Sequence, residues 1–193
     1  MTGQLLDLTR GRLGGGISLD RAQGDLAQAV SAVVDEIRLA YPGREIQCET
    51  RSDLVGFWDL DRLAQVVSNL LGNALVHGDA KGKVMLRLDV TDSVILTVHN
   101  AGTPIAKSDL DAIFDPYRRS GATPSNGLGL GLFIAKQIVL AHGGQISVAS
   151  SDDGGTTFTV TLPWTVESSP AAAASRKEGS GAPNGSSQLS LDL

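Results

Sequence analysis

The sequence predicts a two-layer α/β sandwich, in which a mixed, mainly antiparallel sheet carries helices on one of its faces. Three observations support this fold class. Helix-like and strand-like segments alternate through residues 17–164, and the strand-like segments place apolar residues at every second position, as in a sheet with one buried face. An amphipathic helix is also expected over residues 59–77, and its apolar side suits burial against that sheet.

The first elements are bounded by typical start and stop residues. We expect a helix over about 25–40, because a Pro-Gly pair follows at 42–43. Strands are expected over 45–51 and 54–58, and Asp59 then caps the N-terminus of the second helix.

The second half of the region predicts two pairs of strands that flank a third helix. Turn-forming residues separate the strands within each pair, and glycines end the helix. In chain order, we expect strands over 84–90 and 93–99, a helix over 130–141, and a hairpin of strands over 145–150 and 156–162.

Composition and charge exclude several classes of function. The 193 residues are 41% apolar, enough to bury one core of ordinary size, and the net charge of −5 with no basic arm argues against nucleic-acid binding. Cys48 is the only cysteine, so no internal disulfide forms, and it suits a reducing compartment and a small buried site. No apolar run reaches the roughly 18 residues that span a bilayer, so we expect a soluble, cytoplasmic chain without membrane contact.

Residues 165–193 differ in composition from the rest of the chain. They are rich in Ser, Ala, Gly and Pro, and such a segment cannot bury enough apolar surface to offset the entropy of ordering. We expect a disordered tail there, after one folded domain over 17–164.

Three alternating glycines precede the third helix. Gly127, Gly129 and Gly131 alternate with Leu128 and Leu130, and the helix begins directly at this run. Glycine lets the backbone approach an anion closely, and the unpaired N–H groups and the dipole of a helix start favour phosphate there. A glycine triplet alone is a weak signal and needs support from a second group of residues.

That second group is a polar stripe on the helix over 59–77. Gln65, Asn69, Asn73 and His77 are spaced four residues apart, which places them on one side of the helix. An amide oxygen is a hard ligand that suits Mg²⁺, so Asn73 is the candidate metal ligand. Without the glycine loop, the same asparagines would be expected simply to face water.

Five segments resemble, in order, the sequence boxes of the catalytic ATP-binding domain of sensor histidine kinases. The resemblance covers about residues 17–163. It implies the Bergerat fold of the GHKL ATPases, a superfamily that includes gyrase, a heat-shock chaperone and MutL. The segments are Asn69-Leu-Leu-Gly-Asn73-Ala (N box), Asn100-Ala-Gly102-Thr-Pro-Ile105 (G1 box), Ile113-Phe114-Asp-Pro-Tyr117 (F box), Gly127-Leu-Gly129-Leu-Gly131 (G2 box) and Gly155-Thr-Thr-Phe158 (final box).

The resemblance implies ATP and Mg²⁺ as ligands. Asn73 would hold the metal, Asn100 would recognise adenine, and the glycines of the G2 box would hold phosphates. The nucleotide-binding residues that the resemblance implies are Asn69, Asn73, His77, Asn100, Gly102, Ile105, Phe114, Tyr117, Gly127, Leu128, Gly129, Leu130, Gly131 and Thr157.

Residues 115–126 are rich in Gly, Pro and Ser and are expected to form a mobile lid over the nucleotide. Phe114 and Tyr117 would anchor this lid, although Phe114 equally suits a plain core position. Arg118 or Arg119 would neutralise charge on the phosphates during transfer. The alternative is a solvated loop whose arginines touch nothing.

Two residues of the G1 box depart from the family pattern. Asn100 stands where the family places an aspartate, and Pro104 stands where it places a second glycine. An amide oxygen still accepts a hydrogen bond from the adenine amine, but without charge assistance, at a cost of about 1 kcal/mol. Pro104 removes a backbone donor and stiffens the loop, while Gly102 keeps a small residue beside the base.

Asn69 favours a kinase over an ATP hydrolase. The superfamily's hydrolases place a glutamate at this position to activate water, and an asparagine amide cannot accept that proton. Phosphoryl transfer to an imidazole chiefly needs positioning, metal and charge neutralisation. The candidate catalytic residues are therefore Asn69, Arg118 and Arg119.

None of the three histidines resembles the family's phosphorylated histidine. His77 suits the adenine edge or a plain surface position, whereas His99 and His142 suit packing and capping. We expect the acceptor on a histidine-containing dimerisation domain, in trans or upstream, with a response regulator acting after it. Residues 1–16 resemble the end of such a domain and its linker.

The predicted function is thus the Mg·ATP-binding catalytic domain of a two-component sensor histidine kinase. Residues 6–18 and 99–102 also resemble the phytochrome-associated subset of these kinases, a weaker match. Two alternatives remain open. One is a nucleotide-binding interaction module without catalysis, and the other is a serine kinase of the anti-sigma type, which shares these boxes.

Overall fold

The computed structural model describes residues 17–51, 53–117 and 129–164. The predicted dimerisation remnant (1–16), most of the predicted lid (118–128) and the predicted tail (165–193) lie outside the described residues. The elements, in chain order, are β1 (Ala22–Asp25), α2 (Leu26–Ala40), β2 (Ile46–Thr50), β3 (Val55–Trp58), α3 (Leu60–His77), β4 (Val84–Val90), β5 (Ser93–Asn100), α4 (Gly131–Ala141), β6 (Gln145–Ser151) and β7 (Gly155–Pro163).

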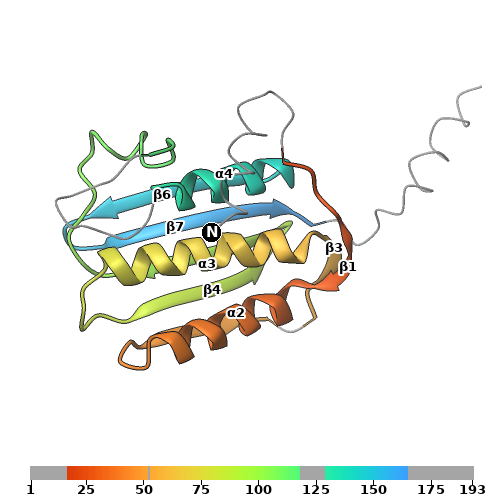
Figure 1. The fold of residues 1–193 in the computed structure, drawn as a ribbon, viewed down its shortest axis with the longest axis horizontal. Helices are drawn as coiled ribbons and strands as arrows, with labels where there is room; N and C mark the ends of the chain where they lie inside the picture. The colour runs from red at the N-terminus through yellow and green to blue at the C-terminus, as the bar shows by residue number, and fades with distance from the viewer. Residues whose placement is uncertain (1–16, 52, 118–128, 165–193) are drawn as a thin grey trace, which may run out of the picture.

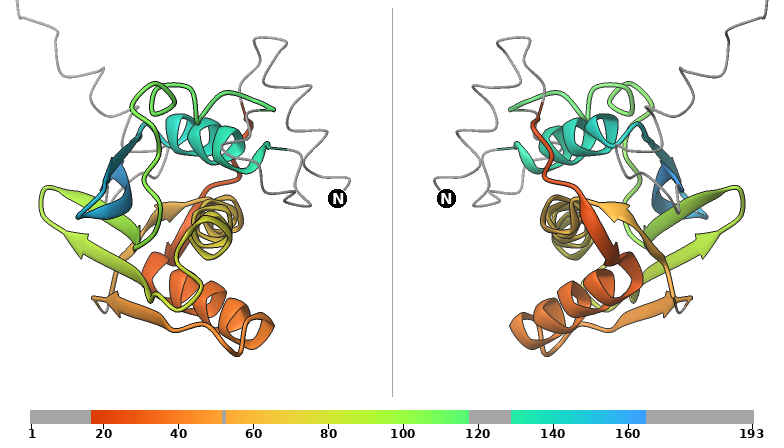
Figure 2. Two further views of the ribbon diagram at one scale, coloured as in Figure 1. Left: turned by 90° about the vertical axis from the view of Figure 1, so that its left-hand side faces the viewer. Right: turned by 90° about the vertical axis from the view of Figure 1, so that its right-hand side faces the viewer.

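Two layers make up the domain. A five-stranded sheet has the order β2-β4-β5-β7-β6, with β2 and β4 parallel and the other neighbours antiparallel. Helices α2, α3 and α4 lie side by side on one face of this sheet (Figure 1). In the two views turned by 90°, none of the described helices covers the opposite face (Figure 2). The predicted α/β sandwich, with a mixed and mainly antiparallel sheet, is confirmed.

Alternating side chains decide which sheet face is buried. On β5, Val94, Leu96, Val98 and Asn100 are buried, whereas the residues between them are only half-buried. The antiparallel register places Phe158 of β7 opposite Val98 on the helix-covered face. Fully burying a side chain of this size contributes about 1.5–3 kcal/mol, so the helix-covered face supplies most of the core.

Helix α3 lies in the middle of the helical layer, between α2 and α4. Its start is fixed as predicted, because Asp59 Oδ1 accepts the Arg62 N–H at 3.1 Å. Its apolar positions are buried against the sheet: Leu63, Val66, Val67, Leu70, Leu71, Ala74 and Leu75. The polar stripe is thereby left on the side of α3 that does not face the sheet.

One short element has no counterpart among the predicted strands. β1 pairs antiparallel with β3 in a separate two-stranded sheet, with Ala22 opposite Trp58 and Asp25 opposite Val55. The sequence Ala-Gln-Gly-Asp has no apolar alternation, so the periodicity of the chain gives no signal for it. Asp25 instead caps α2 through Oδ1, which accepts the Ala27 N–H at 2.9 Å.

Candidate nucleotide site

Asn69 of α3 lies directly against the first residue of α4. A Cβ placed on Gly131 would lie 3.3 Å from Asn69 Oδ1, so a larger residue here would crowd the Asn69 carboxamide. The Nδ2 of Asn69 is buried and has no hydrogen-bond partner among the described residues. A buried amide donor without a partner costs about 1–3 kcal/mol, which makes this atom a candidate ligand contact.

The start of α4 offers backbone donors and no side-chain cap. Leu130 occupies the N-cap position without a capping hydrogen bond, and its own side chain is buried in the core. Gly129 precedes it with φ of +67°, a conformation that glycine adopts without strain. The predicted N-box and G2-box residues Asn69 and Gly131 are therefore brought together. Gly127 and Leu128 lie outside the described residues, as do Arg118 and Arg119.

The rest of the polar stripe follows α3 toward its C-terminus. Asn73 is half-buried one turn beyond Asn69, and His77 is exposed in the last turn. No cluster of three or more His, Cys, Asp and Glu able to hold a metal ion occurs within the described ranges. A cation at Asn73 would therefore depend on a carboxamide oxygen together with oxygens of the nucleotide.

Asn100 ends β5 beside the C-terminus of α3. It is 4% exposed, and its Nδ2 donates to the carbonyl of Ala101 at 3.1 Å, so this hydrogen bond does not use the acceptor atom Oδ1. A Cβ on Gly78 would lie 3.0 Å from Asn100 Nδ2, and one on Gly102, with φ of +141°, would lie 2.9 Å from the backbone nitrogen of Asp79. The G1-box turn is thus packed against the end of α3 through glycine backbones.

Thr156, which was not among the predicted site residues, shares the sheet face of Asn100. It pairs with Asn100 in the register and is buried, whereas the predicted Thr157 pairs with His99 on the opposite face and hydrogen-bonds its Nδ1 at 3.0 Å. The structure therefore does not bring Thr157 together with Asn100. The signal was present in the sequence, because the residue two before Phe158 must share its face.

Ile105 is held at this end through β6. Its backbone N–H donates to Ser150 Oγ at 3.0 Å, and Ser150 Oγ lies 2.7 Å from Thr156 Oγ1. The loop after the G1 box is thereby tied to the strand pair β6 and β7. Pro104 has no N–H, so the hydrogen bond to Ser150 is made by the next residue, Ile105.

The two F-box aromatics differ in burial. Phe114 is 7% exposed, packs edge-on against Phe158 with centroids 6.3 Å apart, and carries Lys136 Nζ 5.5 Å from its ring centroid. Tyr117 is 56% exposed, has φ of +64°, and donates its N–H to the Gly129 carbonyl at 3.0 Å. Phe114 is a core residue, and Tyr117 links the end of the F box to the start of α4.

His142 ends α4 and is buried at the start of α3. Its Nδ1 lies 2.9 Å from the Ile138 carbonyl, and its Nε2 accepts the Asp59 N–H at 3.3 Å. Burial lowers the pKa of His142, and the Arg21 guanidinium lowers it further, against the opposite effects of the Ile138 carbonyl and Asp59. The predicted capping and packing role of this histidine agrees with these contacts.

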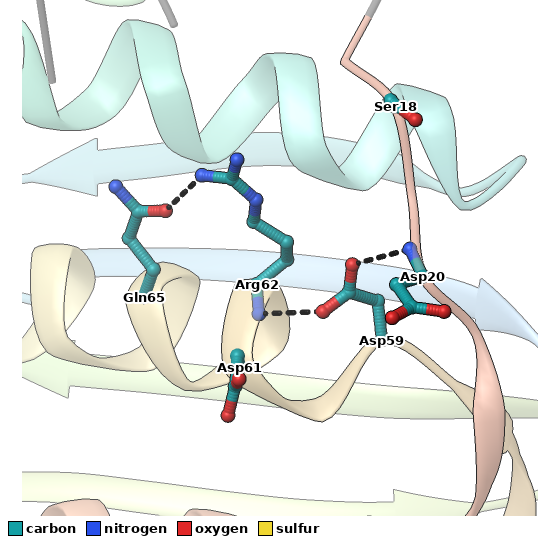
Figure 3. A pocket seen from close by; sticks show the side chains of 6 residues that line it. All are labelled: Ser18, Asp20, Asp59, Asp61, Arg62 and Gln65. Atoms are coloured by element: carbon teal, nitrogen blue, oxygen red, sulfur yellow. Dashed lines mark hydrogen bonds between the residues drawn. The ribbon is translucent and has the colours of Figure 1, made fainter. Parts of the chain in front are cut away.

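A pocket of about 490 Å³ adjoins the N-terminal turns of α3. Figure 3 shows the side chains of Arg62 and Gln65 directed from α3 toward α4, with the segment of Ser18 and Asp20 closing the other side. Arg62 Nη1 donates to Gln65 Oε1 at 3.1 Å. The pocket is lined by Ser18, Asp20, Asp59, Asp61, Arg62 and Gln65.

Known proteins of similar sequence include a bacteriophytochrome and a sensor histidine kinase. A bacteriophytochrome of Pseudomonas aeruginosa is 36% identical over 167 residues, which cover 84% of this chain and 23% of that protein. The sensor histidine kinase WalK of Bacillus subtilis is 37% identical over 115 residues, which cover 56% of this chain and 19% of WalK. The chain thus spans less than a quarter of the length of either relative.

Solved structures agree with the fold. The catalytic domain of histidine kinase ThkA matches with a TM-score of 0.66 at 27% identity, covering 76% of this chain and 97% of that domain. Full-length ShkA in complex with AMPPNP matches with a TM-score of 0.71 at 25% identity, covering 87% of this chain and 36% of ShkA. Within the described ranges, no helix is both long and apolar enough to cross a membrane.

The family described as histidine kinase-, DNA gyrase B- and HSP90-like ATPase matches residues 58–166, more than half of the 193-residue chain. This range contains α3, β5 and α4, the elements that carry Asn69, Asn100 and Gly131. The resemblance that the five sequence boxes indicate is confirmed, and the chain belongs to the family of histidine kinase-, DNA gyrase B- and HSP90-like ATPases.

Proposed function

We propose that the chain binds Mg·ATP between α3, the start of α4 and the ends of β5 and β7, and transfers the γ-phosphoryl group to a histidine on another domain. The observation that carries this proposal is the Nδ2 of Asn69 beside Gly131, which is buried and has no hydrogen-bond partner in the described part of the chain. A phosphate at the start of α4 would accept from that donor and from the first backbone N–H groups of the helix.

The residues at the two ends of this site have different tasks. Asn100 Oδ1 accepts from the adenine amine, and Thr156, rather than Thr157, supports it from the same sheet face. Asn73 would hold Mg²⁺, which supplies positive charge against the phosphates when bound. Asn69 positions the phosphates and cannot serve as a base for water, so the site favours transfer over hydrolysis.

The transfer conserves atoms and electrons without a further reactant. A nitrogen of the acceptor imidazole forms a bond to the γ-phosphorus, while the bond from that phosphorus to the bridging oxygen breaks and its electron pair stays on ADP. The second ring nitrogen then releases its proton to water. The product is a phosphoramidate, which is stable in base and labile in acid.

Two measurements test the proposal. Titration of a fluorescent ATP analogue with and without Mg²⁺ should show metal-dependent binding that Asn73→Ala weakens, whereas Ser68→Ala, on an exposed part of α3, should bind as the wild type does. Label from γ-labelled ATP should then appear on an added histidine-bearing dimerisation domain as acid-labile, base-stable phosphate.

Other results would redirect the proposal. Binding without transfer to any acceptor domain would favour the non-catalytic nucleotide-binding module, and acid-stable label would favour the serine kinase. Equal affinity with and without metal, in both wild type and Asn73→Ala, would remove Asn73 from its assigned role.

A further inference from the structure

The pocket beside Arg62 and Gln65 has no role in the nucleotide site as proposed so far. It lies at the N-terminal turns of α3, whereas Asn100 lies at the C-terminal end of the same helix. With a rise of about 1.5 Å per residue, Asn69 is about 13 Å from Gly78 and about 10 Å from Arg62 along α3. Along α3, Gly78 therefore marks the end beside the base, Asn69 marks the phosphate position, and Arg62 marks the N-terminal end beside the pocket.

Arg62 shares the side of α3 that carries the asparagines. Residues separated by seven and eleven positions lie close to one line on a helix, and Arg62, Asn69 and Asn73 have this spacing. Asp61, by contrast, points away from Arg62 and Gln65 (Figure 3). A nucleotide that extends from Asn100 past Asn73 and Asn69 therefore directs its terminal phosphate toward Arg62.

The backbone around Arg62 is fixed by Asp59. The two carboxylate oxygens of Asp59 accept the Asp20 N–H at 2.9 Å and the Arg62 N–H at 3.1 Å. The Arg62 guanidinium is in turn oriented by Gln65 Oε1 at 3.1 Å, toward the space between α3 and α4. An oriented guanidinium binds phosphoryl oxygens with less loss of side-chain freedom than a mobile one.

We propose that Arg62, oriented by Gln65, contacts the terminal phosphoryl group, and that the pocket beside it admits the imidazole of the acceptor domain. This inference rests on the proposed function. The acceptor nitrogen attacks phosphorus on the side away from ADP, which is the side of the pocket. The carboxylate of Asp20 at its margin favours the positive charge that the ring carries after attack and before it releases a proton to water.

The test compares ATP with ADP, because only ATP has the terminal phosphate. Arg62→Gln should lower affinity for ATP about tenfold and leave affinity for ADP unchanged, measured by calorimetry on the full chain. Arg62→Lys should recover part of the loss. Gln65→Ala should give a smaller loss, again for ATP only. Arg87→Gln removes an exposed charge from the bare face of the sheet and should change neither affinity.

A pocket-filling variant tests the acceptor part separately. Ser18 is exposed at the margin of the pocket, so Ser18→Phe should leave ATP and ADP affinities unchanged and reduce transfer of label to the histidine-bearing domain by tenfold or more, about 1.4 kcal/mol in barrier height. Unaltered transfer would exclude the pocket as the acceptor site.

The outcomes separate this inference from the proposed function. If the wild type binds both nucleotides and Arg62→Gln weakens ATP and ADP equally, or neither, the inference fails while the proposed function stands. If the wild type binds neither nucleotide, both fail.

Discussion

The two ends of the nucleotide site are built in different ways. The base end, defined by Asn100, Gly102 and Thr156, is formed by strand ends and a glycine turn whose polar groups largely pair with each other. The phosphate end, defined by Asn69 and Gly131, joins two helices and holds a buried donor that no group of residues 17–51, 53–117 or 129–164 pairs with. Packing therefore shapes the base end before any ligand binds, whereas the phosphate end keeps an unmet hydrogen bond that a ligand can satisfy.

The largest expected effect is a loss of stability caused by a substitution next to the base end. Gly155 has φ of +60°, and a Cβ there would collide with the backbone oxygen of Asn100. Because a non-glycine residue is strained at this φ and backbone cannot move aside cheaply, Gly155→Ala should lower the free energy of unfolding by about 2–5 kcal/mol, measured by urea unfolding.

Gly43→Ala is the matched control for this substitution. Gly43 has open space around the position of a Cβ, so its replacement should change the free energy of unfolding by less than about 0.5 kcal/mol. Equal stability of the Gly43→Ala and Gly155→Ala proteins would contradict the tight packing of the base end.

A second substitution separates stability from binding at the phosphate end. Asn69→Leu removes the buried donor that has no partner among the residues that the structure describes, so the free energy of unfolding should stay level or rise by about 1 kcal/mol. Affinity for ATP should nevertheless fall about thirtyfold, since the phosphates lose a direct donor. Urea unfolding and nucleotide titration of the same protein check both parts.

Loss of stability and affinity together would assign Asn69 a structural role and would weaken the proposed contrast between the two ends. Ser68→Ala, at the neighbouring exposed position of α3, should alter neither quantity.

A third, smaller effect concerns the glycine opposite Asn69. Gly131→Ala places a methyl group 3.3 Å from Asn69 Oδ1, at a helical position where alanine is otherwise favoured by up to about 1 kcal/mol. We expect unchanged or slightly higher stability and a fivefold to tenfold loss of nucleotide affinity, about 1–1.4 kcal/mol.

Gly72→Ala is the control, because Gly72 is also helical but has open space around its Cβ position. It should gain stability without losing affinity. If Gly131→Ala binds nucleotide as tightly as Gly72→Ala does, the approach of phosphate to Gly131 is not supported.

The parts of the fold that local chemistry controls could be predicted from the sequence. Helix α3 was expected over 59–77 and spans Leu60–His77, because Asp59 is a capping residue and the apolar spacing is regular. Helix α4 was expected over 130–141 and spans Gly131–Ala141, because Gly143 and Gly144 end it. The meeting of Asn69 with Gly131 followed only from the family resemblance, since no local pattern links positions so far apart.

The remaining features depend on register or on long-range contacts. Adjacent residues of a strand lie on opposite faces of the sheet. Thr156 therefore shares the face of Asn100, whereas the predicted Thr157 does not. Asp59 forms hydrogen bonds with Asp20, 39 positions away, and with His142, 83 positions away. No periodicity of the sequence predicts these two hydrogen bonds. The pocket beside Arg62 depends on the same contacts, so it too required the structure.

The smallest expected effect concerns the junction of His142 with Asp59, where α4 ends and α3 begins. Nδ1 of His142 donates to the Ile138 carbonyl, so Nε2 can accept the Asp59 N–H only while the ring is neutral. The charged groups that face this ring are Arg21 and Asp59, and the pKa of His142 is lowered chiefly by burial. The unfolded chain therefore takes up a proton at a higher pH than the folded chain does.

The sign of the pH dependence follows from this difference. Above the ordinary histidine pKa of about 6.5 both states are neutral, and the full contribution of His142 to stability is present. As the pH falls below that value the unfolded state gains a proton first, so the free energy of unfolding decreases until the lowered pKa of the folded state is reached. His142→Gln, which keeps a donor and an acceptor but does not titrate, should show a shallower decrease in urea unfolding between pH 8 and pH 5, whereas exposed His77→Gln should follow the wild type. Parallel decreases in wild type and His142→Gln would show that other groups control the acid response, and that the junction of His142 with Asp59 tolerates a charged ring.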